Sequence, residues 1–191
     1  MAITSDDYNV AWGFERMEQS RIKSKSNYLF KITVVGPDDS LLEDVLSTFD
    51  PVVKVDGIRI VSADHSTDDS NVRAVFMSPK HAVLDILLSL TFKGASAVMI
   101  VLKDPDPELE TIYRNEIREN LGTKVPTQVV TIGSTIDDFK RAEIHHIFDG
   151  LIEEILSKKE KERQAKTKKA KEKQKSKTKA ESKKKSAKKK K

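Results

Sequence analysis

Hydrophobic residues along this chain fall into short continuous runs that alternate with stretches of helical spacing. The runs 29–35 and 97–102 are rich in Val and Ile, as in strands that are covered on both faces of a sheet. Apolar residues spaced three and four apart predict helices at 40–49, 81–93, 107–121 and 136–156. Further strands are expected at 52–63, 72–77 and 125–132. This alternation predicts an α/β fold around a mostly parallel sheet, with one early antiparallel hairpin.

Two of the predicted helices have recognisable ends. Ser40 and Glu43 have the spacing of a capping box, which predicts that the first helix begins near Ser40. Pro107 and Gly122 bracket the helix expected at 107–121, because proline favours a first helical position and glycine a position just past the end. The inward face of this helix is expected to hold Leu109, Ile112, Tyr113, Ile117 and Leu121.

The region 52–77 is interrupted twice, and either interruption could be a hairpin turn. One is Asp56-Gly57, a strong short-range turn signal, and the other is the longer polar run 64–71. We favour the second, so that 52–63 forms one long strand paired with 72–77.

Charge divides the chain of 191 residues, whose net charge is +5, into an acidic body and a basic tail. Residues 158–191 hold 19 of the 35 basic and 4 of the 30 acidic residues, which gives +15 for the tail and −10 for the rest. Such a tail buries too little apolar surface to offset its chain entropy, so we expect it to be disordered or at most transiently helical. Residues 1–27 are polar, and Trp12, Phe14 and Met17 are spaced for a short helix that could dock on a domain at 28–157.

Composition excludes several classes of protein. The chain has no cysteine, which removes disulfide scaffolds, thiol catalysis and zinc fingers. The longest stretch without Asp, Glu, Lys or Arg, 125–136, is too short to span a bilayer, and the polar start is unlike a secretory signal. We therefore expect a cytoplasmic protein.

Residues 28–36, with the sequence YLFKITVVG, resemble the opening of Ras/Rab-type small GTPases, where such a strand leads into the phosphate-binding loop. The segment 93–101 resembles that family's fourth strand and the turn before it, and a long last helix precedes a basic tail. The resemblance covers about 28–157. It implies a P-loop GTPase-like three-layer sandwich, which is shortened here because too few residues precede the last helix to form the family's sixth strand.

The phosphate-binding motif of that family is degenerate. Placed on G-x-x-x-x-G-K-[ST], Gly36 fills the first glycine, and the last three positions hold Leu41, Leu42 and Glu43. Leu41 has a side chain where the backbone must close around phosphates, Leu42 removes the neutralising cation, and Glu43 replaces the hydroxyl that would ligate Mg²⁺. A capped helix is the better interpretation of this segment.

Other motifs of the family match as poorly. The Mg²⁺ and γ-phosphate motif falls on 77–80 in the preferred alignment or on 64–67 in the alternative, and neither has both required residues. The guanine-reading motif falls on 134–137, where only Asp137 matches. We interpret Asp137 as an acidic residue in the first turn of the last helix, with Thr135 and Asp138 at capping-box spacing.

The remaining candidate residues give weaker evidence for a functional site. Adjacent His145 and His146 point to different sides of a helix, and His65 and His81 have no ligand-spaced partners, so we expect surface or packing roles and no metal site. Asp38 and Asp39 after the first strand leave a response-regulator receiver as a minor alternative fold.

These observations predict a non-catalytic pseudo-GTPase that acts as an interaction or scaffold module without a cofactor, with an unidentified protein partner. The first alternative is a divergent protein that still binds GTP or GDP with Mg²⁺ through Gly36 and Asp137. The second is a nucleic-acid-associated protein. All but one of the tail's basic residues are lysines, which favours nonspecific contact with nucleic acid or anionic membrane. The densest lysines are Lys183, Lys184, Lys185, Lys188, Lys189, Lys190 and Lys191.

Overall fold

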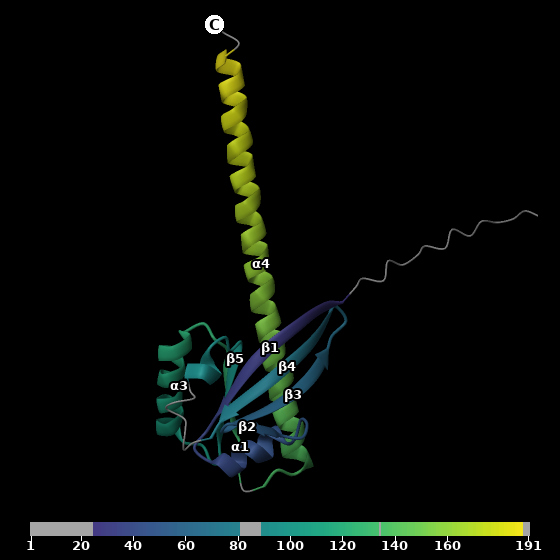
Figure 1. Ribbon diagram of the computed structural model, residues 1–191, viewed down its shortest axis with the longest axis vertical. Helices are drawn as coiled ribbons and strands as arrows, with labels where there is room; N and C mark the ends of the chain where they lie inside the picture. Colours follow the sequence, from purple (N-terminus) through teal and green to yellow (C-terminus); the bar gives the residue numbers. More distant parts are fainter. Residues whose placement is uncertain (1–24, 81–88, 134, 189–191) are drawn as a thin grey trace, which may run out of the picture.

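The computed structural model describes residues 25–80, 89–133 and 135–188. Within these residues, six strands form one sheet in the order β2-β3-β4-β1-β5-β6, with helices α1, α3 and α4 packed on it (Figure 1). The elements are β1 (Ser26–Val35), α1 (Asp39–Leu46), β2 (Val53–Val55), β3 (Ile58–Ser66), β4 (Ser70–Pro79), β5 (Ala97–Leu102), α3 (Pro107–Leu121), β6 (Thr127–Thr131) and α4 (Asp138–Lys188).

The sheet is mixed. Strand β1 pairs in parallel with β4 and β5, and β5 pairs in parallel with β6, whereas the pairs β2-β3 and β3-β4 are antiparallel. The predicted α/β class and mostly parallel sheet are confirmed. The long strand predicted at 52–63 is wrong, because Asp56 and Gly57 adopt positive φ angles of 48° and 82° and turn the chain between β2 and β3. Positive φ at both central residues is the geometry of a tight hairpin, so both interruptions of this region are turns.

Alternating side chains of the central strands divide the core into two layers. On β5, Ala97, Met99 and Val101 pack with residues of α1 and α4, while Val98, Ile100 and Leu102 pack with residues of α3. Successive residues of a strand point to opposite faces, so a continuous apolar run requires cover on both. The sheet therefore lies between two helical layers, as in a three-layer sandwich.

The ends of α3 are as predicted, because Asp106 caps its first turn, Pro107 opens it and Gly122 ends it with a φ of 80°. One residue of its expected inward face is wrong, since Ile112 is 62% exposed. The helix predicted at 81–93 lies largely outside the described residues. Of its end, residues 89–92 are helical and Phe92 is buried against the α3 layer.

Helix α4 departs from the sequence expectation at both ends. It begins at Asp138, two residues after the predicted start, and Phe139 in its first turn is 78% exposed. At the other end, residues 158–188, expected to be disordered or transiently helical, continue the helix beyond the sheet (Figure 1). Lys, Ala, Glu and Gln all have high helix propensity, which accounts for a helix that has no core to pack against. In the described residues no strand lies between β6 and α4.

Candidate functional site

The loop after β1 and the first turn of α1 form the region that corresponds to the P-loop in the resemblance. This region lies at the carboxyl ends of the parallel strands, where α/β proteins commonly bind ligands. Gly36 lies here against β5. A Cβ atom added to Gly36 would overlap the carbonyl oxygen of Val101, so the close packing of two backbones requires glycine at this position.

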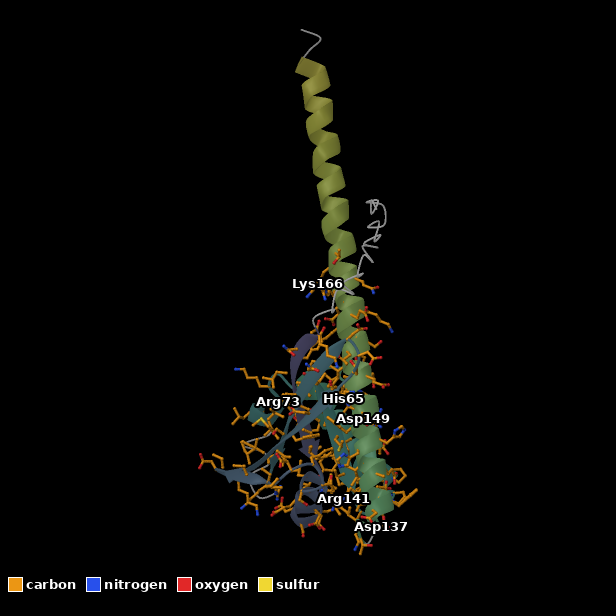
Figure 2. All side chains as sticks on the ribbon, turned by 90° about the vertical axis from the view of Figure 1, so that its right-hand side faces the viewer. His65, Arg73, Asp137, Arg141, Asp149 and Lys166 are labelled. Carbon is orange, nitrogen blue, oxygen red and sulfur yellow. The ribbon has the colours of Figure 1, made fainter. Side chains whose placement is uncertain are left out.

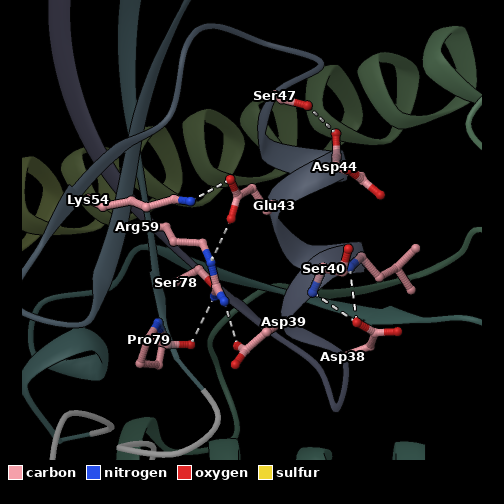
Figure 3. Close-up of polar contacts among 11 residues, drawn as sticks. Asp38, Asp39, Ser40, Glu43, Asp44, Ser47, Lys54, Arg59, Ser78 and Pro79 are labelled. Carbon is pink, nitrogen blue, oxygen red and sulfur yellow. Dashed lines mark hydrogen bonds and ion pairs between the residues drawn. The ribbon is translucent and has the colours of Figure 1, made fainter.

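The first turn of α1 is capped by the chain itself. The Oδ1 atom of Asp38 accepts hydrogen bonds from the backbone N–H groups of Ser40 and Leu41, at 2.9 and 3.2 Å (Figure 3). The predicted cap at Ser40 is therefore wrong by two residues. A phosphate bound at a helix start accepts hydrogen bonds from the free backbone N–H groups of the first turn. Here the Asp38 carboxylate already accepts from two of these groups.

The next two positions of the degenerate motif are apolar packing residues. Leu42 is 1% exposed and belongs to the core between the sheet and α4, and Leu41 is half-buried against the same core. Leu42 therefore cannot be replaced by an ammonium-bearing side chain without placing charge in the core.

Glu43 is held by two basic side chains. The Nζ atom of Lys54 lies 2.6 Å from Glu43 Oε1, and Arg59 Nε lies 3.9 Å from Oε2. The hydrogen bond from Lys54, with further help from the charge of Arg59, holds the pKa of Glu43 below its usual range. The position aligned with a Mg²⁺-ligating hydroxyl thus carries a carboxylate that is already neutralised by the chain.

Arg59 is the central residue of this cluster and was not found by sequence reasoning. Its side chain is 2% exposed, and its guanidinium lies 2.5 Å from Asp39, 3.5 Å from the hydroxyl of Ser78 and 3.4 Å from the carbonyl oxygen of Pro79 (Figure 3). The preferred alignment assigns the segment 77–80 to Mg²⁺ and γ-phosphate binding. In the structure, this segment instead supplies two hydrogen-bond acceptors to a buried arginine. Arg59 has no motif spacing to the first loop, so nothing in the sequence indicates this contact.

The acidic residue of the guanine-reading alignment caps the last helix. Asp137 Oδ1 accepts a hydrogen bond of 2.7 Å from the backbone N–H of Lys140, and its carbonyl accepts from the N–H of Arg141. The expected acidic residue near the start of α4 is thus present, but the cap is Asp137 itself and not the predicted Thr135. Lys140 Nζ reaches back to the carbonyl oxygen of Thr131 at the end of β6.

Two of the four histidines join α4 to the rest of the domain. His65 Nδ1 on β3 lies 2.8 Å from Asp149 Oδ1 on α4 (Figure 2), and His145 Nε2 lies 3.0 Å from the carbonyl oxygen of Thr48. A small open pocket of about 420 Å³ is lined by His145 and Asp149 among other residues. His81 lies outside the described residues. Within the described ranges, no group of three or more His, Asp or Glu side chains is arranged to hold a metal ion.

The lysines singled out in the tail lie at the far end of α4. Lys183, Lys184, Lys185 and Lys188 are in the helix, and residues 189–191 are outside the described ranges. Nearer the domain, Lys159, Arg163 and Lys166 are exposed on the same helix. No helix in the part of the chain that the structure describes is long and apolar enough to cross a membrane.

Comparisons with known proteins add no family assignment. The sequence matches no protein-family model, and a search of curated proteins finds no significant match.

Proposed function

We propose that this protein is a non-catalytic, small-GTPase-like interaction module whose lysine-rich helix contacts anionic partners. The observation that carries the proposal is the chemistry at the start of α1. Asp38 occupies two N–H groups of the first turn, Leu42 is buried in the core, and Glu43 is paired with Lys54. These donors and acceptors do not fit a phosphate with its Mg²⁺, which needs free N–H groups, a lysine and a hydroxyl.

The charge on α4 supports the second half of the proposal. Residues 138–188 form one helix, and at 1.5 Å per residue the part after 167 extends about 32 Å beyond the body. The +15 charge of 158–191 is carried by a segment with alanine as its only apolar residue type, so it has nothing to bury against a protein core. A segment rich in lysine and without aromatic residues favours polyanion contact through charge alone.

The nucleotide part of the proposal is tested by thermal unfolding of the full chain with millimolar GTP or GDP and Mg²⁺. A ligand that binds only the folded state raises the midpoint, by about 2.7 kcal/mol of added stability at a hundredfold excess over Kd. We expect no shift with either nucleotide. A clear upward shift would establish the GTP-binding alternative and would return attention to Gly36 and Asp137.

The polyanion part is tested by salt titration of binding to a structureless RNA and to vesicles that contain anionic lipid. The matched variant replaces Lys183, Lys184, Lys185, Lys188, Lys189, Lys190 and Lys191 with glutamine, which keeps helix propensity and removes charge. We expect affinity to fall steeply with salt, and the variant to show a smaller salt slope because it releases fewer counterions. Comparison of RNA with vesicles identifies the preferred anion. Equal, weak binding by both chains to both probes would rule out a polyanion role.

A further inference from the structure

An open groove of about 1290 Å³ lies between α4 and the end of the sheet at which β1 begins. Its walls come from the start of β1, from the turn between β3 and β4, and from residues 156–167 of α4. Ser26 and Tyr28 line the first wall, Asp69 the second, and Leu156 and Arg163 the third. The groove is distinct from the cluster around Arg59, which lies at the opposite ends of the parallel strands.

The groove combines an apolar floor with a wall of mixed charge. The ring of Tyr28 stacks on buried Phe30 at 5.7 Å, and half-buried Leu156 packs against the same core. Lys159 Nζ lies 4.7 Å from the centre of the Phe30 ring and 5.8 Å from that of Tyr28, which holds a cation over the aromatic pair. Arg163 and Lys166 follow Lys159 at helical spacing on exposed turns of α4. Glu160 and Glu162 of the same helix, and Asp69 of the facing turn, also line the groove.

The chain enters the domain at this groove. The backbone N–H of Ser26 donates to the carbonyl oxygen of Asp69 at 3.0 Å, and Lys25 contacts Ser66, so the first described residues lie at the rim. Met17 precedes Lys25 by eight residues, and eight extended residues reach about 27 Å. The wall from 156 to 167 is about 16 Å long on a helix, so the segment that contains Met17 can reach all of it.

The composition of the N-terminal segment complements the groove. Its bulky apolar residues are Trp12, Phe14 and Met17. Residues 8–18 contain two acidic side chains, Glu15 and Glu18, and one basic one, Arg16, whereas residues 158–167 of α4 contain five basic and two acidic ones. Apolar side chains therefore match the Tyr28–Leu156 floor, and Glu15 and Glu18 are complementary to the basic side chains of α4.

We propose that residues 8–18 of the same chain dock in this groove, with Trp12, Phe14 and Met17 against Tyr28 and Leu156. Glu15 and Glu18 of this segment lie opposite the basic side chains of Lys159, Arg163 and Lys166. The docked segment covers the part of α4 nearest the domain, so it competes with a polyanion for those three side chains. This competition rests on the proposed polyanion function, whereas the docking itself does not.

Trp12 is the single tryptophan of the chain, so its fluorescence reports the position of this segment in the full-length protein. We expect a blue-shifted emission maximum and several-fold weaker quenching by acrylamide than in a synthetic peptide of residues 1–24. Emission and quenching equal to those of the peptide would overturn the docking. A dependence of the shift on protein concentration would place the segment in a second copy and would overturn docking within one chain.

A pair of charge reversals on α4 locates the docking site. Arg163 lines the groove, whereas Lys161, two residues away and equally exposed, does not. We expect Arg163→Glu to move Trp12 emission and quenching towards the peptide values, and Lys161→Glu to leave both close to those of the unmodified protein. Equal effects of the two reversals would contradict a site in the groove and would indicate a general response to helix charge.

Addition of heparin to the unmodified protein tests the competition. Binding is followed by anisotropy of labelled heparin, and docking by Trp12 quenching. Release of Trp12 in step with heparin binding supports the competition, and binding without release overturns it. Absence of heparin binding would instead remove the polyanion function and leave the docking to be decided by Trp12 alone.

Discussion

The guanidinium of Arg59 lies 2.5 Å from the carboxylate of Asp39, and the two residues join the second strand of a hairpin to the first turn of α1. The arginine is 2% exposed, while the aspartate is 42% exposed and keeps contact with water. The buried charge is therefore the arginine, and its Nε has no hydrogen-bond partner among the described residues. A residue that depends on so few acceptors is sensitive to the loss of any of them.

We predict that Asp39→Ala lowers the free energy of unfolding by about 1–3 kcal/mol, because it leaves a buried guanidinium short of an acceptor. In an Arg59→Met background, the same substitution is expected to cost less, because the guanidinium that needs this acceptor is already gone. Urea unfolding of the four chains measures the coupling directly.

The control for this cycle is Asp38→Ala. Asp38 caps α1 and has no contact with Arg59 among the interactions found, so its loss should cost about 1 kcal/mol in either background. Additive effects of Asp39→Ala and Arg59→Met would show that the pair contributes nothing beyond its separate residues.

Much of the fold follows from local patterns. The apolar run 97–102 coincides with β5, and Pro107 with Gly122 gives the ends of α3, because both signals act within a few residues. Asp56-Gly57 is a turn in the structure, whereas the sequence favours one longer strand through it. A two-residue turn interrupts a Val- and Ile-rich run without changing its composition, so the run alone cannot reveal it.

The candidate site is less accessible from sequence. The substitutions Leu41, Leu42 and Glu43 are visible in the motif, and they remove the expected phosphate ligands without showing what replaces them. In the structure, the acidic side chains at the start of α1 pair with Arg59. This arginine reaches α1 only because the β2-β3 turn and the β3-β4 pairing bring it there. Contacts set by strand register leave no spacing signature in the chain.

Leu42 and Leu41 provide a direct test of the degenerate motif. Leu42→Ala is expected to cost about 2–5 kcal/mol, as at other fully buried leucines, and Leu41→Ala clearly less because Leu41 is only half-buried. Denaturant midpoints of the two variants give the comparison. An equal, small loss for both would mean that the helix start is not packed on the core and is free to rearrange around a ligand.

Acid should destabilise the protein partly through Glu43 and Asp64. Lys54 lowers the pKa of Glu43 and Arg73 lowers the pKa of Asp64, in each case through a hydrogen bond from the basic side chain. A lowered pKa means that the unfolded chain binds the proton more readily. The stabilisation is therefore complete above the ordinary carboxyl pKa of about 4 and is lost as the pH falls through the lowered value.

We expect Glu43→Gln to reduce the loss of stability between about pH 5 and pH 3, since glutamine does not titrate. Asp64→Asn should act in the same direction and additively, because Asp64 has a different partner. The measurement is urea unfolding at a series of pH values. An acid dependence that is unchanged in both variants would show that other carboxyl groups control acid unfolding.

Gly36 and Gly150 form a matched pair of glycines with opposite expected responses to alanine. A Cβ atom at Gly36 would overlap the carbonyl oxygen of Val101, and neither backbone can move without disturbing the β1-β5 pairing. We predict that Gly36→Ala lowers stability by about 1–3 kcal/mol, as other overpacking substitutions do. Gly150 lies inside α4 with open space around its added Cβ, so Gly150→Ala should raise stability by about 0.5–1 kcal/mol through helix propensity alone.

Thermal and urea unfolding of both variants decide between two explanations of Gly36. If Gly36→Ala is tolerated as well as Gly150→Ala, close packing against β5 does not explain the glycine, and a role in approach to a phosphate regains support.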